Sequence, residues 1–262
     1  MCKVKHGKSE GRDVEVKIFD AHFHIIDLEF PIIENQGYTP SNYSTLDYQK
    51  ETADFHITGG AIVSGSFQGF DQDYLRRALE QMGPTFCGVT QLPFTVTDDE
   101  ILNLHNSGVR ALRFNVERGG SENLSQLDYF ARRVYDLVGW HSELYINAKE
   151  LPNIITMVES LPAISIDHLG LSEEGLPHLL KLVDKGIKVK ATGFGRVELD
   201  VQNALKSIYR INPDALMFGT DLPSTRAKRP FRHEDIELIQ ELFDDQAVDK
   251  ILYTNAHQWY FK

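Results

Sequence analysis

The chain of 262 residues is poor in cysteine and contains no long apolar run. Its two cysteines, Cys2 and Cys87, are too few for a disulfide framework and lack the C-x-x-C spacing of zinc sites, so we expect a protein of the reducing cytoplasm. No stretch approaches the roughly 20 apolar residues that cross a bilayer. The first dozen residues are polar and basic without the apolar segment of a secretory signal, and we expect residues 1–16 to form a flexible arm.

Positive charge is also scarce. The chain has 27 Lys and Arg against 38 Asp and Glu, a formal net charge of −11. This balance argues against nucleic acid and anionic membranes as partners, because both attract basic surfaces. Neither a G-x-G-x-x-G motif nor a P-loop follows an apolar run, so the nucleotide-binding folds lose support. The composition leaves a homodimer open.

Short apolar runs alternate with longer amphipathic segments along most of the chain. The runs predicted to be strands are residues 16–24, 59–66, 85–92, 109–116, 141–148, 163–170, 187–193 and 215–221. The segments predicted to be helices are residues 45–56, 71–82, 98–106, 125–139, 150–160, 173–185, 199–211 and 233–245. In the fourth of these, Leu127, Phe130 and Val134 recur at the three- and four-residue steps of a helix face.

Strict alternation of strands and helices predicts parallel strands joined by right-handed crossovers. Eight such units suit a closed (β/α)₈ TIM barrel, which typically needs about 250 residues. We therefore predict an α/β fold with one barrel domain over residues 17–262. The longest loop, at residues 25–44, is long enough to cover the mouth of a pocket.

Four reactive side chains are expected at the C-terminal ends of predicted strands, where barrel enzymes place their chemistry. His22 and His24 share a face of the first strand because side chains alternate along a strand. His168 ends the sixth strand and Asp221 ends the eighth. Each signal alone is weak, since a lone H-x-H or a lone strand-end aspartate is more often structural. Together they predict a reaction centre.

The motifs around these residues resemble the amidohydrolase superfamily, and within it the amidohydrolase-related (amidohydrolase 2) branch. The matching motifs are Asp20-Ala-His-Phe-His24, Asp167-His-Leu-Gly170, Gly219-Thr-Asp-Leu-Pro223 and Asn255-Ala-His-Gln-Trp-Tyr260, with two further blocks at residues 108–115 and 189–196. The branch includes 2-pyrone-4,6-dicarboxylate lactonases, sugar lactonases and non-oxidative decarboxylases. The resemblance spans about residues 17–261 in the expected order.

The resemblance implies one divalent metal ion, zinc or manganese, held by His22, His24, His168 and Asp221. Binuclear members also use a lysine on the fourth strand, where this chain has Arg113. Arginine stays protonated and cannot be carbamylated into a bridging ligand, so we expect a mononuclear centre at most. The lactonase members are thought to work without metal, and the sequence leaves a metal-free centre open.

Polar and cationic side chains gather at the same end of the predicted barrel. Arg113 and Asn115 share the inward face of the fourth strand, Lys190 lies on the seventh and Arg196 just beyond it. A buried arginine needs a partner, and a substrate carboxylate would suit it. We therefore predict that these four residues bind a small anionic substrate. Arg226, Lys228 and Arg229 follow the eighth strand; for the last two, ordinary salt bridges are the better expectation.

The prediction is a hydrolase that cleaves the C–O ester bond of a small carboxylated lactone. Asp221 would activate water as general base, while His22, His24 and His168 polarise the carbonyl or hold the oxyanion. A metal-dependent non-oxidative decarboxylase of the same branch is the alternative enzyme. A barrel retained only for binding is the non-catalytic alternative, and retention of all three histidines and the aspartate argues against it.

Overall fold

The computed structural model describes residues 16–262 and forms one sheet of eight parallel strands in sequential order. The strands are β1 (Ile18–Phe23), β2 (Ile57–Val63), β3 (Phe86–Thr90), β4 (Val109–Asn115), β5 (His141–Tyr145), β6 (Ile164–Ile166), β7 (Lys188–Ala191) and β8 (Leu216–Phe218). Every predicted strand is present, although most are shorter than predicted. The predicted (β/α)₈ TIM barrel in a single domain is confirmed.

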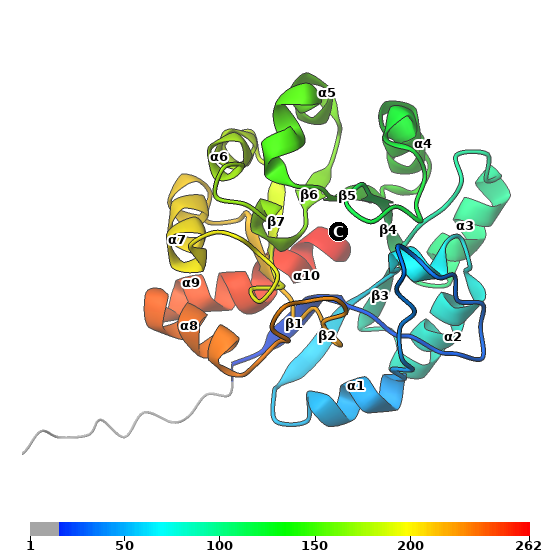
Figure 1. Cartoon of the computed structure of the whole chain (residues 1–262), viewed down its shortest axis with the longest axis horizontal. Helices are drawn as coiled ribbons and strands as arrows, with labels where there is room; N and C mark the ends of the chain where they lie inside the picture. The colour runs from blue at the N-terminus through cyan, green and yellow to red at the C-terminus, as the bar shows by residue number, and fades with distance from the viewer. Residues whose placement is uncertain (1–15) are drawn as a thin grey trace, which may run out of the picture.

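Helices follow the strands and surround the ring (Figure 1). They are α1 (Thr45–Glu51), α2 (Asp73–Met82), α3 (Asp98–Asn106), α4 (Leu127–Val138), α5 (Ile155–Ser160), α6 (Leu176–Asp184), α7 (Val201–Ile211) and α8 (Glu234–Leu242). Short 3₁₀ turns are η1 (Ser66–Gln68), η2 (Leu124–Gln126), η3 (Ala148–Asn153) and η4 (His168–Gly170). Leu127, Phe130 and Val134 are buried on α4, which confirms the predicted helix face.

The first and last strands meet at a seam that backbone hydrogen bonds close beyond the end of β8. The N–H of Asp221 donates to the carbonyl of His22, and the N–H of His24 donates to the carbonyl of Leu222, each at 2.7 Å. Gly219 permits this close approach, because a Cβ there would lie 2.6 Å from the backbone nitrogen of His22. The seam therefore fixes β1 against the segment that carries Asp221.

The C-terminal segment closes the other end of the barrel. It consists of α9 (Asp245–Asp249), the π-helical turn η5 (Lys250–Thr254) and α10 (Asn255–Tyr260), and α10 crosses the centre of the ring in Figure 1. Ala256 and Tyr260 of α10 pack in one apolar cluster with Phe19 and Met217 from the strands. The Cys87 thiol is buried in the same cluster, as the apolar run around it predicts. The C-terminal segment therefore covers this end of the barrel and packs against the strands.

No helix within residues 16–262 is long and apolar enough to cross a bilayer. Of the expected arm at 1–16, only Val16 is described, and it packs against the core. The remainder of the expected arm, including Cys2, lies outside the described residues.

Candidate active site

The four predicted reactive residues converge at the C-terminal ends of β1, β6 and β8. His22, His24, His168 and Asp221 are all buried, with at most 5% of any of them exposed. The His22 ring lies 5.1 Å from the ring of His24 and 4.8 Å from that of His168, measured between centroids. Oδ1 of Asp221 is 3.8 Å from Nε2 of both His22 and His24. The structure thus gathers residues separated by up to 199 positions into one cluster.

Two atoms of this cluster are buried without a hydrogen-bond partner among the described residues, Nε2 of His22 and Oδ1 of Asp221. Buried polar atoms are nearly always paired, so unpaired atoms that face each other indicate a place for a ligand or a water. The backbone is also unusual here, because His168 has φ 50° and Asp221 has φ 61°. Residues other than glycine adopt such angles rarely, and often at functional sites.

Arg196 holds the other oxygen of Asp221. Its Nε donates to Oδ2 of Asp221 at 2.8 Å and its Nη2 donates to the same atom. Burial raises the pKa of the Asp221 carboxyl, but the charge of Arg196 outweighs it and holds the pKa well below its usual range. Asp221 is therefore a carboxylate with one oxygen bound by arginine and one oxygen free.

Hydrogen bonds on the far side of each ring orient His24 and His168. Nδ1 of His24 lies 2.7 Å from the carbonyl of Val63, and since a carbonyl only accepts, Nδ1 carries a proton. A neutral His24 then presents the lone pair of Nε2 toward Asp221. Nδ1 of His168 is 2.8 Å from Oγ1 of Thr192. Burial lowers the pKa of His168 well below its ordinary value, so its ring is neutral.

Lys190 does not lie at the rim, where its position in the sequence suggested, but inside the barrel. Its side chain is fully buried, and Nζ donates to Oε2 of Glu143 at 2.5 Å and to Nδ1 of His22 at 3.3 Å. Residues of β7 alternate between the interior and the helices, and Lys190 falls on the interior side one layer below the mouth. The position of Lys190 below the mouth therefore argues against a direct contact with substrate.

Arg113 already has a carboxylate partner. Its Nη2 donates to Oδ2 of Asp167 at 2.9 Å, its Nε to the same atom at 3.3 Å, and its Nη1 to the carbonyl of Ser64. From the sequence we expected a substrate carboxylate to pair with Arg113. In the structure Asp167, the residue directly before His168, pairs with it instead. The Asn115 side chain accepts from the N–H of Arg118 and so shapes the loop after β4.

A narrow chamber of about 30 Å³ lies at this cluster, and a neighbouring cavity of about 300 Å³, the vestibule, shares lining residues with it. His24, Arg113, Asn115, His168 and Asp221 line the chamber. Residues shared by the chamber and the vestibule are Arg118, Tyr145, Arg196 and Arg226. The entrance is therefore ringed by guanidinium groups.

Sequence reasoning did not single out Arg118 or Tyr145 as parts of this entrance. Their signal was their position at or just after the C-terminal ends of β4 and β5. The long first loop supports the same entrance, because Nη2 of Arg226 donates to Asn35 and its guanidinium stacks on Tyr38 at 4.4 Å. Lys228 and Arg229 pair with Glu198 and Asp235, as expected for ordinary salt bridges.

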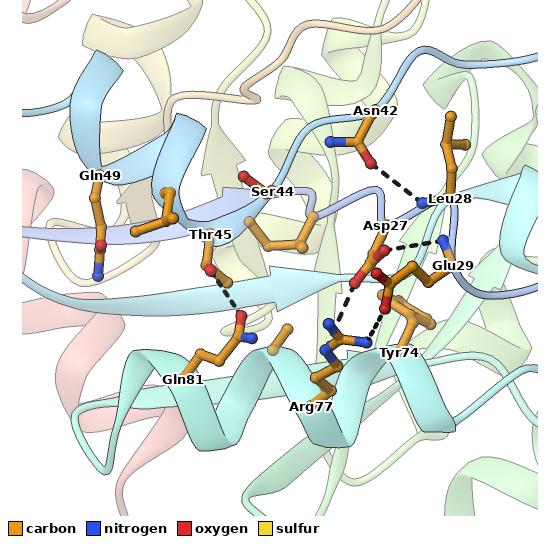
Figure 2. A pocket seen from close by; sticks show the side chains of 13 residues that line it. Asp27, Leu28, Glu29, Asn42, Ser44, Thr45, Gln49, Tyr74, Arg77 and Gln81 are labelled. Carbon is orange, nitrogen blue, oxygen red and sulfur yellow. Dashed lines mark hydrogen bonds and ion pairs between the residues drawn. The ribbon is translucent and has the colours of Figure 1, made fainter.

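A larger cavity, of about 750 Å³, lies elsewhere, between the first loop and helices α1 and α2 (Figure 2). Its polar side chains bind one another: Arg77 donates to Glu29, and Thr45 donates to Gln81. The predicted reactive residues and cations are all absent from its lining. The groove is therefore separate from the reactive cluster.

Two groups of side chains are spaced closely enough to hold a metal ion. One is His22, His24 and Asp221, and the other is His22, Asp167 and His168. Within each group the ligand atoms lie within 4.8 Å of one another. The unpaired Oδ1 of Asp221 and the free Nε2 of His24 suit a cation. His22 does not, because an ammonium only donates, so Lys190 requires Nδ1 of His22 to accept. The one proton of a neutral His22 is then on Nε2, which cannot ligate. Asp167 offers only Oδ1, because Arg113 holds Oδ2, and this atom faces the Lys190 ammonium at 3.9 Å. The donor set therefore fits a metal poorly, and we derive no step through one.

A (β/α)₈ barrel with buried histidines and an aspartate at the C-terminal ends of its strands has the architecture of a barrel hydrolase. The comparison with protein families gives the particular group. A model described as "Amidohydrolase" matches residues 19–262, and the chain belongs to this family.

Relatives and solved structures agree with that assignment. The chain is 27% identical over 266 residues to a 4-sulfomuconolactone hydrolase of Rhizobium radiobacter, covering 90% of this chain and 87% of the relative. It is 28% identical to a 2-pyrone-4,6-dicarboxylate hydrolase of Comamonas testosteroni over 58% of this chain, a match that spans only about half (51%) of that relative. The fold is similar to that of a probable 2-pyrone-4,6-dicarboxylic acid hydrolase from Acinetobacter baumannii, with a TM-score of 0.81, 24% identity, and coverage of 94% of this chain and 99% of the other.

Proposed function

We propose that the protein hydrolyses the C–O ester bond of a small lactone that carries carboxylate groups. The observation that carries the proposal is the unpaired Oδ1 of Asp221, buried beneath an entrance ringed by arginines. The curated relatives support the substrate class, because their names specify a pyrone dicarboxylate and a sulfonated muconolactone. Both are cyclic esters with anionic substituents.

The chamber has room for a water at the position where the nucleophile is needed. A volume of about 30 Å³ holds one water molecule. Such a water would donate one proton to Oδ1 of Asp221 and the other toward Nε2 of His24, both of which are acceptors. Asp221 then removes a proton as the oxygen attacks the lactone carbonyl. In this proposal His24 orients the water rather than polarising the carbonyl.

The carbonyl oxygen becomes negative as the tetrahedral intermediate forms, and it needs a donor. In this proposal His22 supplies one through the proton on Nε2, and His168, whose ring lies 4.8 Å from that of His22, lines the chamber. Collapse of the intermediate breaks the ring C–O bond. The proton that Asp221 took up can pass to the departing oxygen, which leaves a hydroxy acid or its keto tautomer.

A lactone ring is larger than the chamber, so part of the lining must move when substrate enters. Arg196 is the side chain to which we assign this movement, because it borders both the chamber and the vestibule and is bonded to Asp221. A substrate carboxylate would compete with Asp221 for this guanidinium. Loss of the Arg196 charge from Oδ2 raises the basicity of Asp221 at the moment when a base is required.

Arg118 and Arg226 would hold a second anionic group at the entrance. Arg113 and Asn115 lie deeper, and a substrate carboxylate reaching Arg113 would share it with Asp167. An arrangement of several fixed guanidiniums suits a dicarboxylate better than a monocarboxylate, because each group can bind one carboxylate in a bidentate fashion.

The test is a panel of lactones matched in ring but differing in carboxylate number, with products followed by NMR. Ring-opened acid from the dicarboxylated members, with neutral lactones at least a hundredfold poorer in kcat/KM, is expected. Release of carbon dioxide that stops on exhaustive chelation would instead establish the decarboxylase alternative. Absence of ring opening across the panel would overturn the proposal.

A further inference from the structure

Lys190 is a buried ammonium group directly beneath the reactive cluster. Three acceptors from three different strands surround Nζ: Oε2 of Glu143 at 2.5 Å, Nδ1 of His22 at 3.3 Å and Oδ1 of Asp167 at 3.9 Å. It lies on the opposite side of the His22 ring from Asp221, since Nδ1 faces Lys190 and Nε2 faces Asp221. The proposed hydrolysis gives Lys190 no direct role.

Residues at the end of the barrel that α10 covers hold this ammonium in place. Oε1 of Glu143 accepts from the hydroxyl of Tyr260 on α10 at 2.5 Å and lies 3.0 Å from Nε2 of His141. Burial raises the pKa of Glu143, but the charge of Lys190 and the hydrogen bond with His141 keep it at about 2. Glu143 is thus a fixed carboxylate, and its ion pair with Lys190 leaves the ammonium little freedom to turn away from His22.

The hydrogen bond between Lys190 and His22 determines where the His22 proton lies. A neutral imidazole has one N–H and one lone pair, and an ammonium has no lone pair to accept with. A doubly protonated ring would point an N–H at the Lys190 ammonium 3.3 Å from Nδ1, and two donors cannot bond to each other, so the ring is neutral. With Nδ1 accepting from Lys190, the single proton of His22 is on Nε2.

Asp167 is the group that would favour the opposite arrangement. Its Oδ1 lies 3.7 Å from Nδ1 of His22 and would accept a proton placed there. That distance is too long for a hydrogen bond, whereas the contact with Lys190 at 3.3 Å is within range. Arg113 also draws the Asp167 carboxylate toward β4 through its other oxygen.

We propose that Lys190 is a positioning residue that keeps the proton of His22 on Nε2, which makes His22 a hydrogen-bond donor facing Oδ1 of Asp221 instead of a ligand for a metal ion. The location of the proton is independent of the substrate. Only its use, donation to the reacting oxygen, rests on the proposed lactone hydrolysis.

The proton can be located directly by nitrogen-15 NMR of the full-length protein labelled at histidine. In the native protein, Nε2 of His22 is expected to give the shift of a protonated ring nitrogen and Nδ1 that of an unprotonated one. A His22→Gln variant assigns the signal by its disappearance. The reverse pattern in the native protein would overturn the proposal, and this result does not depend on any variant of Lys190 folding.

Removal of the ammonium should move the proton. Lys190→Met combined with Glu143→Gln removes both charges of the ion pair and so avoids a lone buried carboxylate. In this double variant the proton is expected to shift to Nδ1, toward Asp167, and Zn²⁺ alone should bind at least tenfold more tightly, measured by competition with a chromogenic chelator. Lys188→Met, on the same strand but bonded to the carbonyl of Asp214, is the matched control and should leave both readouts unchanged.

The two proposals fail separately. If no lactone is hydrolysed but His22 carries its proton on Nε2, the assignment of Lys190 stands and the substrate class is wrong. An unchanged tautomer and unchanged Zn²⁺ affinity in the folded double variant would instead show that Lys190 does not control His22.

Discussion

Nε2 of His22 faces Oδ1 of Asp221 at 3.8 Å, with both atoms buried and neither paired among the residues that the structure describes. This separation is too long for a direct hydrogen bond. It is short enough for one oxygen atom between them to bond to both. The two residues belong to the first and last strand units of the barrel, so the site requires the barrel to be closed.

Asp221→Asn should abolish turnover while leaving the fold intact. The amide keeps the shape of the side chain but cannot take a proton from water, and loss of a general base costs roughly 10²–10⁴-fold in kcat. Circular dichroism and thermal unfolding should match the native protein. Asp235→Asn is a control at a buried aspartate that pairs with Arg229 outside the chamber. Rates within threefold of native for Asp221→Asn would remove Asp221 as the base.

Arg196→Met should raise KM for carboxylated lactones at least tenfold, with a much smaller change for neutral ones. It should also change the pH profile. The guanidinium keeps the pKa of Asp221 well below its usual range, so its removal lets that pKa rise. The acidic limb of kcat/KM then moves to higher pH. Arg229→Met, which removes a cation outside the chamber, should leave the limb in place; an unmoved limb in Arg196→Met would contradict the assignment.

Arg226→Met should raise KM for a dicarboxylated lactone about tenfold and leave kcat nearly unchanged, because Arg226 lines the entrance and its side-chain hydrogen bonds go to Asn35. Tyr38→Leu removes the ring on which this arginine stacks and should give a smaller change in the same direction. Steady-state kinetics with mono- and dicarboxylated substrates measure both. Equal effects on the two substrates would show that Arg226 does not bind the second carboxylate.

Arg113→Ala should destabilise the protein by roughly 3–5 kcal/mol, because it leaves the buried Asp167 carboxylate without its partner. Adding Asp167→Asn should recover most of that loss in a denaturant titration. If Arg113 also anchors substrate, the double variant will be stable yet retain a raised KM for carboxylated lactones. A stable double variant with native KM would confine Arg113 to a structural role.

Asp20 provides a test of pH dependence. Burial raises its pKa to about 6 although Thr220, His22 and Tyr48 donate hydrogen bonds to it. A pKa raised above the unfolded value of 3.8 gives a stabilising contribution that is present below about pH 4 and is lost as the pH rises through 6. The difference in unfolding free energy between the native protein and Asp20→Asn should therefore fall by up to about 3 kcal/mol over that range. Asp54→Asn, an exposed position, controls for net charge, and a flat difference would contradict the shift.

The barrel and the gathering of the four candidate residues at one end of it could be predicted because their signals are local. Strand ends can be read from apolar runs, and His22, His24, His168 and Asp221 lie within three residues of such ends. The partners of the cations could not be predicted in this way. Asp167 and Glu143 belong to strands that meet Arg113 and Lys190 only after the barrel closes, and the pairing depends on register. Alternation along a strand predicts that Lys190 points into the barrel, but it does not specify that the side chain lies one layer below the mouth.

The seam between β1 and β8 also sets when the site can come into existence. On the ribosome, His22 and His24 emerge about two hundred residues before Asp221. Until the final strand is released, the two histidines have no carboxylate opposite them and the first strand has an unpaired edge. A nascent chain that stalls before β8 is therefore inactive and exposes that edge, so prolonged stalling favours association with other chains.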